Sequence, residues 1–177
     1  MNDATTTTTT TTTSRPLSLQ AALERRRSEG RKLLVPYVTA GITSDWVELV
    51  EAIIAAGADA VEIGIPFSDP AMDGPTIQAA SVRALDAGIT PAGALDALRG
   101  REFAVPLIAM TYFNLVFRHG TERFAADLAA AGLSAAILPD LPFEAAAEWQ
   151  AAAAAHGIES VLLAAPVSSD ERLAELA

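Results

Sequence analysis

Short runs of apolar residues alternate along this chain with longer stretches in which apolar positions recur at helical spacing. The short runs predict β-strands, and the longer stretches predict helices that bury one face. Five strands are expected, at residues 33–39, 60–64, 106–110, 135–138 and 160–163. A leading helix is expected within 17–29, with further helices at 44–56, 76–87, 91–98, 120–131 and 143–156. Strand and helix in repeated alternation predict a parallel sheet with right-handed crossovers.

The predicted strands are continuous apolar runs, which is typical of a sheet covered on both faces. Successive strands begin mostly about 25 to 29 residues apart, and one longer gap holds the additional helix at 91–98. This spacing fits a (β/α)8 barrel and also an open doubly wound sheet. The pattern of apolar positions alone leaves both architectures open.

Residues at the predicted helix ends follow the usual start and stop chemistry. Ser44 is expected to cap the helix at 44–56, and Pro75 is expected at the first helical position before 76–87. Gly57 and Gly157 follow predicted helices, where glycine readily adopts the left-handed conformation that ends a helix.

Composition favours one globular domain behind a polar tail. Hydrophobic residues make up 51% of the 177 residues and the mean hydropathy is +0.30, which suits a sizeable core. Residues 1–16 contain the run of threonines at 5–13, which can bury little surface. We therefore expect a disordered Thr-rich tail at 1–16 and a folded domain at 17–177.

Charge and residue usage exclude several classes of protein. The net charge of −10 argues against nucleic acid as a partner, since phosphate contacts need clustered cations. Cysteine is absent, so disulfides and thiolate metal ligands are excluded, and two histidines argue against a metal site. No apolar run approaches the roughly 20 residues of a membrane helix, and no secretory signal pattern opens the chain. We expect a cytoplasmic protein with no membrane partner.

Two acids lie at the two ends of one predicted strand–loop–helix connection. Glu62 interrupts an apolar run, where a carboxylate is costly without a partner or a function. Because side chains alternate along a strand, Glu62 lies on the face opposite Val61 and Ile63. Burial is expected to raise the pKa of Glu62, whereas a helix N-terminus is expected to favour the Asp73 anion. From the residues alone, catalysis and a buried ion pair for Glu62 are equally favoured.

Both acids lie within 61–78, VEIGIPFSDPAMDGPTIQ, which closely resembles the signature of the tryptophan synthase alpha subunit. PYVTAG at 36–41, YFNLVF at 112–117 and LPDLP at 138–142 resemble further segments of that family in the same order. The resemblance runs from about residue 17 to the last residue and implies a TIM (β/α)8 barrel. With about five of the eight strands present, 17–177 is expected to be an incomplete barrel domain, truncated after Ala177 inside a further helix.

The resemblance implies a carbon–carbon lyase of tryptophan biosynthesis that cleaves indole-3-glycerol phosphate to indole and glyceraldehyde 3-phosphate. It implies that Glu62 is the acid–base group of this retro-aldol reaction and that Asp73 accepts a hydrogen bond from the indole N–H. Tyr112 and Tyr37, expected at one rim, are candidates for binding the substrate. No metal or organic cofactor is expected in this chain.

In the resembled family, the loop equivalent to 66–73 faces a beta subunit that carries pyridoxal phosphate, within an α2β2 heterotetramer. Pro66 and Asp69 are the candidates for contacting that partner. Asp140 is expected to order a loop of the same rim or to cap a helix, and the sequence leaves both roles open. Two alternative functions also stand: an inactive truncated barrel that at most binds a partner subunit, and a different phosphosugar-handling barrel.

Overall fold

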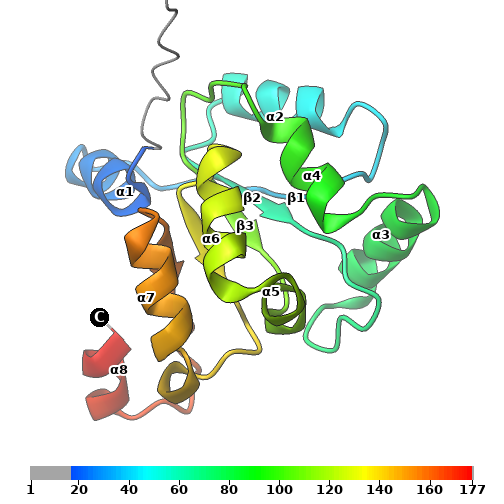
Figure 1. Ribbon diagram of the computed structural model, residues 1–177. Coiled ribbons are helices and arrows are strands. Elements are labelled where there is room, and N and C mark those ends of the chain that lie inside the picture. The colour runs from blue at the N-terminus through cyan, green and yellow to red at the C-terminus, as the bar shows by residue number, and fades with distance from the viewer. Residues whose placement is uncertain (1–16, 177) are drawn as a thin grey trace, which may run out of the picture.

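The computed structural model describes residues 17–176, so the predicted tail at 1–16 lies outside the described residues. Five strands form one sheet in which every neighbouring pair is parallel (Figure 1). The strands are β1 Tyr37–Thr39, β2 Val61–Gly64, β3 Leu107–Met110, β4 Ala135–Ile137 and β5 Glu159–Val161. Their order in the sheet is the order in the sequence. All five predicted strands are therefore confirmed, each within a few residues of its expected position.

The helices follow the strands as the alternating pattern predicts. They are α1 Leu19–Ser28, α2 Trp46–Ala55, α3 Pro75–Asp86, α4 Pro91–Leu98, α5 Phe113–His119, α6 Thr121–Ala130, α7 Ala147–Ala155 and α8 Asp170–Leu176, with a 3-10 turn, η1, at Phe143–Ala145. The sequential strand order distinguishes the two architectures that the pattern left open. A doubly wound sheet reverses its strand order at a switch point, whereas a barrel adds each strand beside the previous one. The sheet has the barrel topology.

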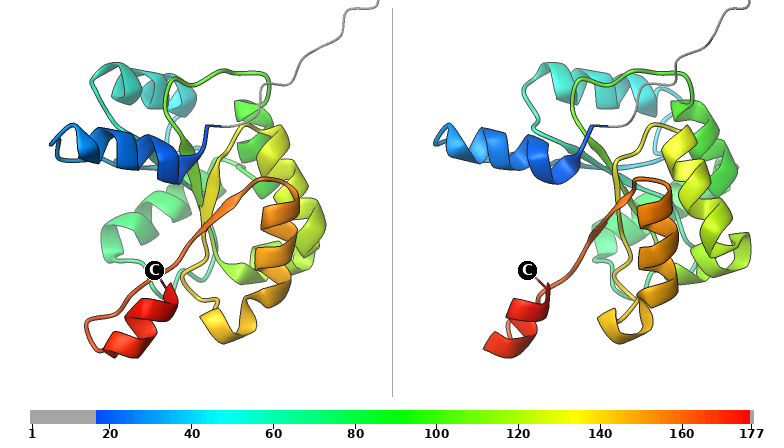
Figure 2. Two further views of the ribbon diagram at one scale, coloured as in Figure 1. Left: turned by 90° about the vertical axis from the view of Figure 1, so that its left-hand side faces the viewer. Right: turned by 60° about the vertical axis from the view of Figure 1, so that its left-hand side comes forward.

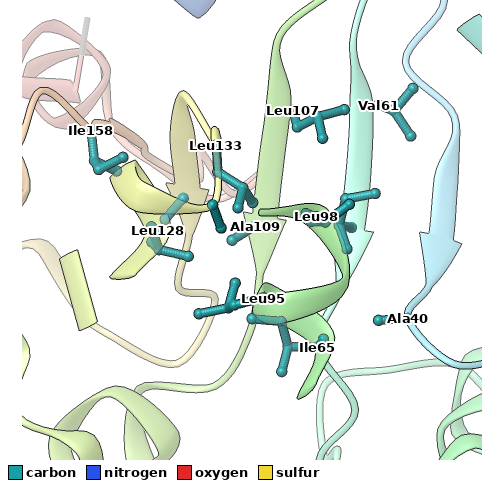
Figure 3. Close-up of a cluster of buried hydrophobic side chains, with 14 of the residues drawn as sticks. Ala40, Val61, Ile65, Leu95, Leu98, Leu107, Ala109, Leu128, Leu133 and Ile158 are labelled. Atoms are coloured by element: carbon teal, nitrogen blue, oxygen red, sulfur yellow. The ribbon is translucent and has the colours of Figure 1, made fainter. Parts of the chain in front are cut away.

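One face of the sheet packs against helices and forms the main hydrophobic core. Val61 and Leu107 point from neighbouring strands toward Leu95 and Leu98 of α4, and Leu128 of α6 extends the same cluster (Figure 3). All five side chains are at least 96% buried, so this layer excludes water. At roughly 25 cal/mol per Å² of apolar area, such burial is the main favourable contribution to folding. The core thus lies between the strands and the outer helices.

The opposite face of the sheet is the inner face of the barrel topology. Figure 2 shows α4, α6 and α7 on one side of the sheet and α1 on the other. Leu19 of α1 packs there against Ala60, Ile108 and Ala135, near the N-terminal ends of the strands. The helix α1 thus covers one end of the inner face and leaves the C-terminal end for the side chains described below.

Several predicted boundaries differ from those in the structure. The first strand begins at Tyr37, and residues 33–36 precede it without regular secondary structure. Asp45, without a side-chain hydrogen bond, stands at the N-cap of α2 where Ser44 was expected. The predicted helix at 143–156 is divided at Ala146 into η1 and α7. The helix α5 was missed altogether. By contrast, α4 has the predicted bounds, because Thr90 caps it with a hydrogen bond from Gly93 N–H at 3.0 Å.

Candidate active site

Glu62 lies on the inner face of the sheet, as the alternation along its strand predicts. Val61 and Ile63 belong to the outer core, whereas Ala60 belongs to the inner cluster, so Glu62 shares its face with Ala60. In the register of the sheet Glu62 is flanked by Tyr37 of β1 and Ile108 of β3. Burial raises the pKa of Glu62, and the negative charge of Asp73 raises it further. The predicted direction of the shift is confirmed.

Asp73 lies near the end of the loop that connects β2 to α3, directly before the N-cap residue Gly74. A turn joins its N–H to the carbonyl of Pro70 at 3.1 Å, and the Gln78 side chain donates to its carbonyl at 2.8 Å. Burial raises the pKa of Asp73, and a hydrogen bond with the Tyr112 side chain opposes this rise. The expectation that the helix N-terminus holds this pKa low is wrong, because desolvation has the larger effect.

Tyr112 connects the end of β3 to the loop that carries Asp73. Its side chain is 96% buried, and its hydroxyl accepts a hydrogen bond from the Met72 N–H at 2.9 Å. Its ring stacks on Phe67, with 5.1 Å between ring centroids and 30° between ring planes. Tyr112 therefore holds both ends of the loop at 67–73, a contact across 40 residues that the sequence pattern does not reveal.

Tyr37 is the first residue of β1, and its side chain reaches toward the C-terminal end of the neighbouring strand β2. Its hydroxyl covers Gly64, where a Cβ atom would collide with it. Burial raises the pKa of Tyr37, and the charges of Asp73 and Glu62 add to the rise. Glycine inside a strand often marks such a close approach, so Gly64 is the signal that sequence reasoning missed.

The remaining candidates lie at the C-terminal ends of the strands but differ in exposure. Pro66 is buried, whereas Asp69 is exposed and accepts a hydrogen bond from the Ser68 hydroxyl at 2.6 Å. Of the two, only Asp69 presents its side chain to solvent. Asp140 accepts a hydrogen bond from the Phe113 N–H at 2.8 Å. Both roles considered for Asp140 are thus present in one contact, since it caps α5 and fixes the loop after β4 to that helix.

Within residues 17–176, no group of three or more His, Asp or Glu side chains is placed to hold a metal ion. The same part of the chain contains no helix long and apolar enough to cross a membrane. The site does contain two carboxylates, Glu62 and Asp73, whose pKa values are both raised by burial, and two tyrosines, Tyr37 and Tyr112, whose pKa values the charge of Asp73 raises. This arrangement is suited to general acid–base chemistry on an aromatic substrate.

Fold and site together define a protein of the (β/α) barrel class, with its candidate chemistry at the carboxyl ends of the strands. A family model described as "Tryptophan synthase alpha chain" matches residues 23–177. The chain belongs to the tryptophan synthase alpha chain family, which confirms the resemblance seen in the sequence.

Relatives and solved structures agree on this family. The tryptophan synthase alpha chain of Chloroflexus aggregans is 46% identical over 157 residues, which cover 86% of this chain and 59% of that protein. The alpha chain of Thermobifida fusca is 44% identical over 160 residues, covering 89% and 59%. The chain thus spans about three fifths of the length of these curated relatives.

Two solved structures place the sheet within a larger barrel. A crystal structure of the alpha chain from Legionella pneumophila matches with a TM-score of 0.81 and 35% identity, over 88% of this chain and 60% of that one. A chain of the tryptophan synthase α2β2 complex from Pyrococcus furiosus matches with a TM-score of 0.73 and 39% identity, over 80% and 62%. The fold is accordingly an incomplete (β/α)8 barrel, as expected from the sequence.

Proposed function

We propose that this chain provides the lyase site that cleaves indole-3-glycerol phosphate to indole and glyceraldehyde 3-phosphate. The observation that carries the proposal is Glu62, a carboxylate with a raised pKa on the inner face of the sheet, beside the charge of Asp73. Membership of the tryptophan synthase alpha chain family supports the choice of reaction. Perturbed acids of this kind concentrate at catalytic sites.

The two carboxylates divide the chemistry of the retro-aldol reaction. Glu62 protonates the indole ring carbon that carries the glycerol chain and removes the proton of the neighbouring glycerol hydroxyl. The carbon–carbon bond then breaks: its electron pair stays with the indole, and the hydroxyl carbon becomes the aldehyde of glyceraldehyde 3-phosphate. Asp73 accepts a hydrogen bond from the ring N–H and stabilises the positive charge that develops there. A raised pKa suits Glu62 to this role, since the carboxyl then holds its proton at a higher pH than an ordinary glutamate does.

Tyr112 and Tyr37 form the aromatic wall against which the indole ring rests. The charge of Asp73 raises the pKa of both tyrosines, and the charge of Glu62 raises that of Tyr37, which supports placing them beside the carboxylates. The proposed reaction uses protons and hydrogen bonds alone, so no cofactor is assigned to this chain. We place the reaction in the cytoplasm, in the biosynthesis of tryptophan.

The proposed partner is a tryptophan synthase beta subunit, in an α2β2 assembly, with pyridoxal phosphate on the partner. The match to a chain of the Pyrococcus furiosus α2β2 complex supports this assembly. The loop with Pro66 and Asp69 is the proposed contact, with exposed Asp69 as its polar group and buried Pro66 shaping its backbone. Addition of a beta subunit is expected to raise indole release, and an unchanged rate would contradict the assembly.

Indole release from indole-3-glycerol phosphate tests the reaction directly, with the 177-residue chain alone and with a beta subunit. Glu62→Gln keeps the shape of the side chain and removes its proton chemistry. We expect it to lower kcat by about 100- to 10,000-fold, the usual contribution of a general acid–base group. Full activity of Glu62→Gln would instead favour a different phosphosugar-handling barrel.

The second candidate is an inactive chain that at most binds a partner subunit. The observation that favours it is length, because the chain covers 59% of its Chloroflexus relative. Under this alternative, the folded chain would release no indole with or without a beta subunit, yet it would still bind that subunit. Binding measured by calorimetry beside the activity assay therefore separates the two candidates.

A further inference from the structure

Three loops at the C-terminal ends of the strands are joined by contacts between distant residues. Asp140, in the loop after β4, accepts a hydrogen bond from the Phe113 N–H at 2.8 Å. Phe113 is the first residue of α5, which follows β3. The contact spans 27 residues of sequence and fixes the loop after β4 to the helix after β3.

Asp140 supplies the side-chain acceptor that the N-cap residue of α5 does not provide. Tyr112 stands at the N-cap of this helix, and its side chain makes no capping hydrogen bond. The first N–H groups of a helix have no partner within the helix, and a carboxylate is favoured there. Asp140 therefore determines where α5 begins, from outside the helix, and with it the backbone position of Tyr112.

Tyr112 links the start of α5 to the loop at 67–73. Its hydroxyl accepts the Met72 N–H at 2.9 Å, and its ring stacks on Phe67. Met72 directly precedes Asp73, so the bond to Met72 holds the backbone next to that carboxylate. The contacts thus run from Asp140 through Phe113 and Tyr112 to the residue before Asp73.

We propose that Asp140 is a positioning residue: by holding the start of α5 it sets the place of the Tyr112 hydroxyl, and through it the orientation of the Asp73 carboxylate. The importance of that orientation for catalysis rests on the proposed function, in which Asp73 binds the ring N–H. The linkage itself is a property of the fold.

The sign of one pKa change distinguishes this linkage from simple charge repulsion. Removing the negative charge of Asp140 would by itself lower the pKa of Asp73, because a nearby anion disfavours ionisation. Moving the Tyr112 hydroxyl away from Asp73 would raise this pKa, because the Tyr112 side chain lowers it in the folded chain. For removal of the Asp140 carboxylate, positioning therefore predicts a higher pKa of Asp73, and charge repulsion alone predicts a lower one.

The experiment is a titration of the Asp73 carboxyl carbon by NMR in the full chain labelled with 13C-aspartate, assigned with Asp73→Asn. Asp140→Ala is expected to raise the pKa of Asp73. Asp140→Asn keeps an oxygen acceptor without the charge, so we expect no rise. Tyr112→Phe keeps the stacking ring and should reproduce the rise, and Asp140→Ala should add nothing further in that background, as expected for residues that act in series.

An unchanged or lowered pKa of Asp73 in a folded Asp140→Ala protein would overturn the proposal. Should the alanine variant fail to fold, Asp140→Glu keeps the charge and displaces the carboxylate by one methylene, so it must also raise this pKa. An additive effect in the Tyr112→Phe background would equally contradict a path through Tyr112.

The titration does not depend on turnover, so it tests the linkage even in a chain that is inactive. In an active chain, Asp140→Ala is expected to lower kcat by about 10- to 100-fold, since small displacements of catalytic groups have effects of this size. The acidic limb of the pH–rate profile should move to higher pH, in parallel with the Asp73 carboxyl. A variant that lost activity without this movement would have only a structural role.

Discussion

The two ends of the parallel strands use carboxylates in opposite ways. At the N-terminal end, the Asp59 carboxylate is 1% exposed, accepts the Leu34 N–H at 2.9 Å, and lies 3.5 Å from the Arg26 guanidinium and 3.8 Å from that of Arg31. The two oxygens of Glu159 each accept an N–H of α1, from Leu19 and Gln20, at 2.8 Å. Each acid at this end has partners that match its charge or its lone pairs.

At the C-terminal end, Glu62 and Asp73 form no ion pair with any residue between 17 and 176. Burial instead raises the pKa of both carboxyls. A paired acid stabilises the fold, whereas an acid buried without a cation is held ready to take up a proton. The comparison therefore separates carboxylates with matching partners at one end of the strands from carboxylates with raised pKa values and no cation at the other.

The largest expected effect on stability belongs to Asp59. Asp59→Ala removes the acceptor of the Leu34 N–H and the anion that faces two arginines. We expect the free energy of unfolding to fall by about 2 kcal/mol. This is less than for a fully buried ion pair, because Arg26 and Arg31 keep contact with water. Urea unfolding at neutral pH measures it. Asp45→Ala, at an exposed aspartate without a capping bond, is the matched control and should change stability by less than about 0.5 kcal/mol.

A smaller effect is expected at Glu159, where the loss is local to α1. Glu159→Ala leaves the N–H groups of Leu19 and Gln20 without acceptors, while the Ser18 cap remains, so we expect a cost of about 1 kcal/mol. Hydrogen exchange at those two amides should accelerate. Glu159→Gln keeps one acceptor oxygen, so its exchange rates should lie between those of the wild type and of Glu159→Ala. Unchanged exchange in the alanine variant would show that Glu159 does not secure α1.

The order of the strands and the inner position of Glu62 follow from local pattern, and both could be predicted. Apolar runs mark the strands, and alternation along one run places Glu62 opposite Val61 and Ile63. The bounds of α4 were equally readable, because its cap, Thr90, and its first residue, Pro91, are adjacent in sequence. Features fixed within a few residues of each other are the ones that the sequence reveals.

Features fixed by distant contacts were missed or misplaced. The helix α5 has seven residues, too few for a clear period, and its N-terminus is held by Asp140 from 27 residues away. The contact between Tyr112 and Met72 spans 40 residues. The pKa of Asp73 depends on how deeply its loop is buried, which outweighs the nearby helix N-terminus. These properties arise only when the loops assemble.

The smallest expected effect concerns Glu62, at the C-terminal end of the strands, and is measured as the pH dependence of stability. The folded-state pKa of Glu62 is raised above its usual 4.5, so the folded chain holds this proton more tightly than the unfolded chain. The stability from the protonated form is complete below pH 4.5 and is lost as the pH rises through the folded-state pKa. Glu62→Gln stays neutral throughout and avoids this loss. The variant should therefore match the wild type at pH 4 and exceed it at pH 8, by less than about 1 kcal/mol because solvent screens a half-buried carboxylate. Urea midpoints across this range measure the difference in stability. A difference that does not change with pH would contradict a raised pKa of Glu62 in the folded chain.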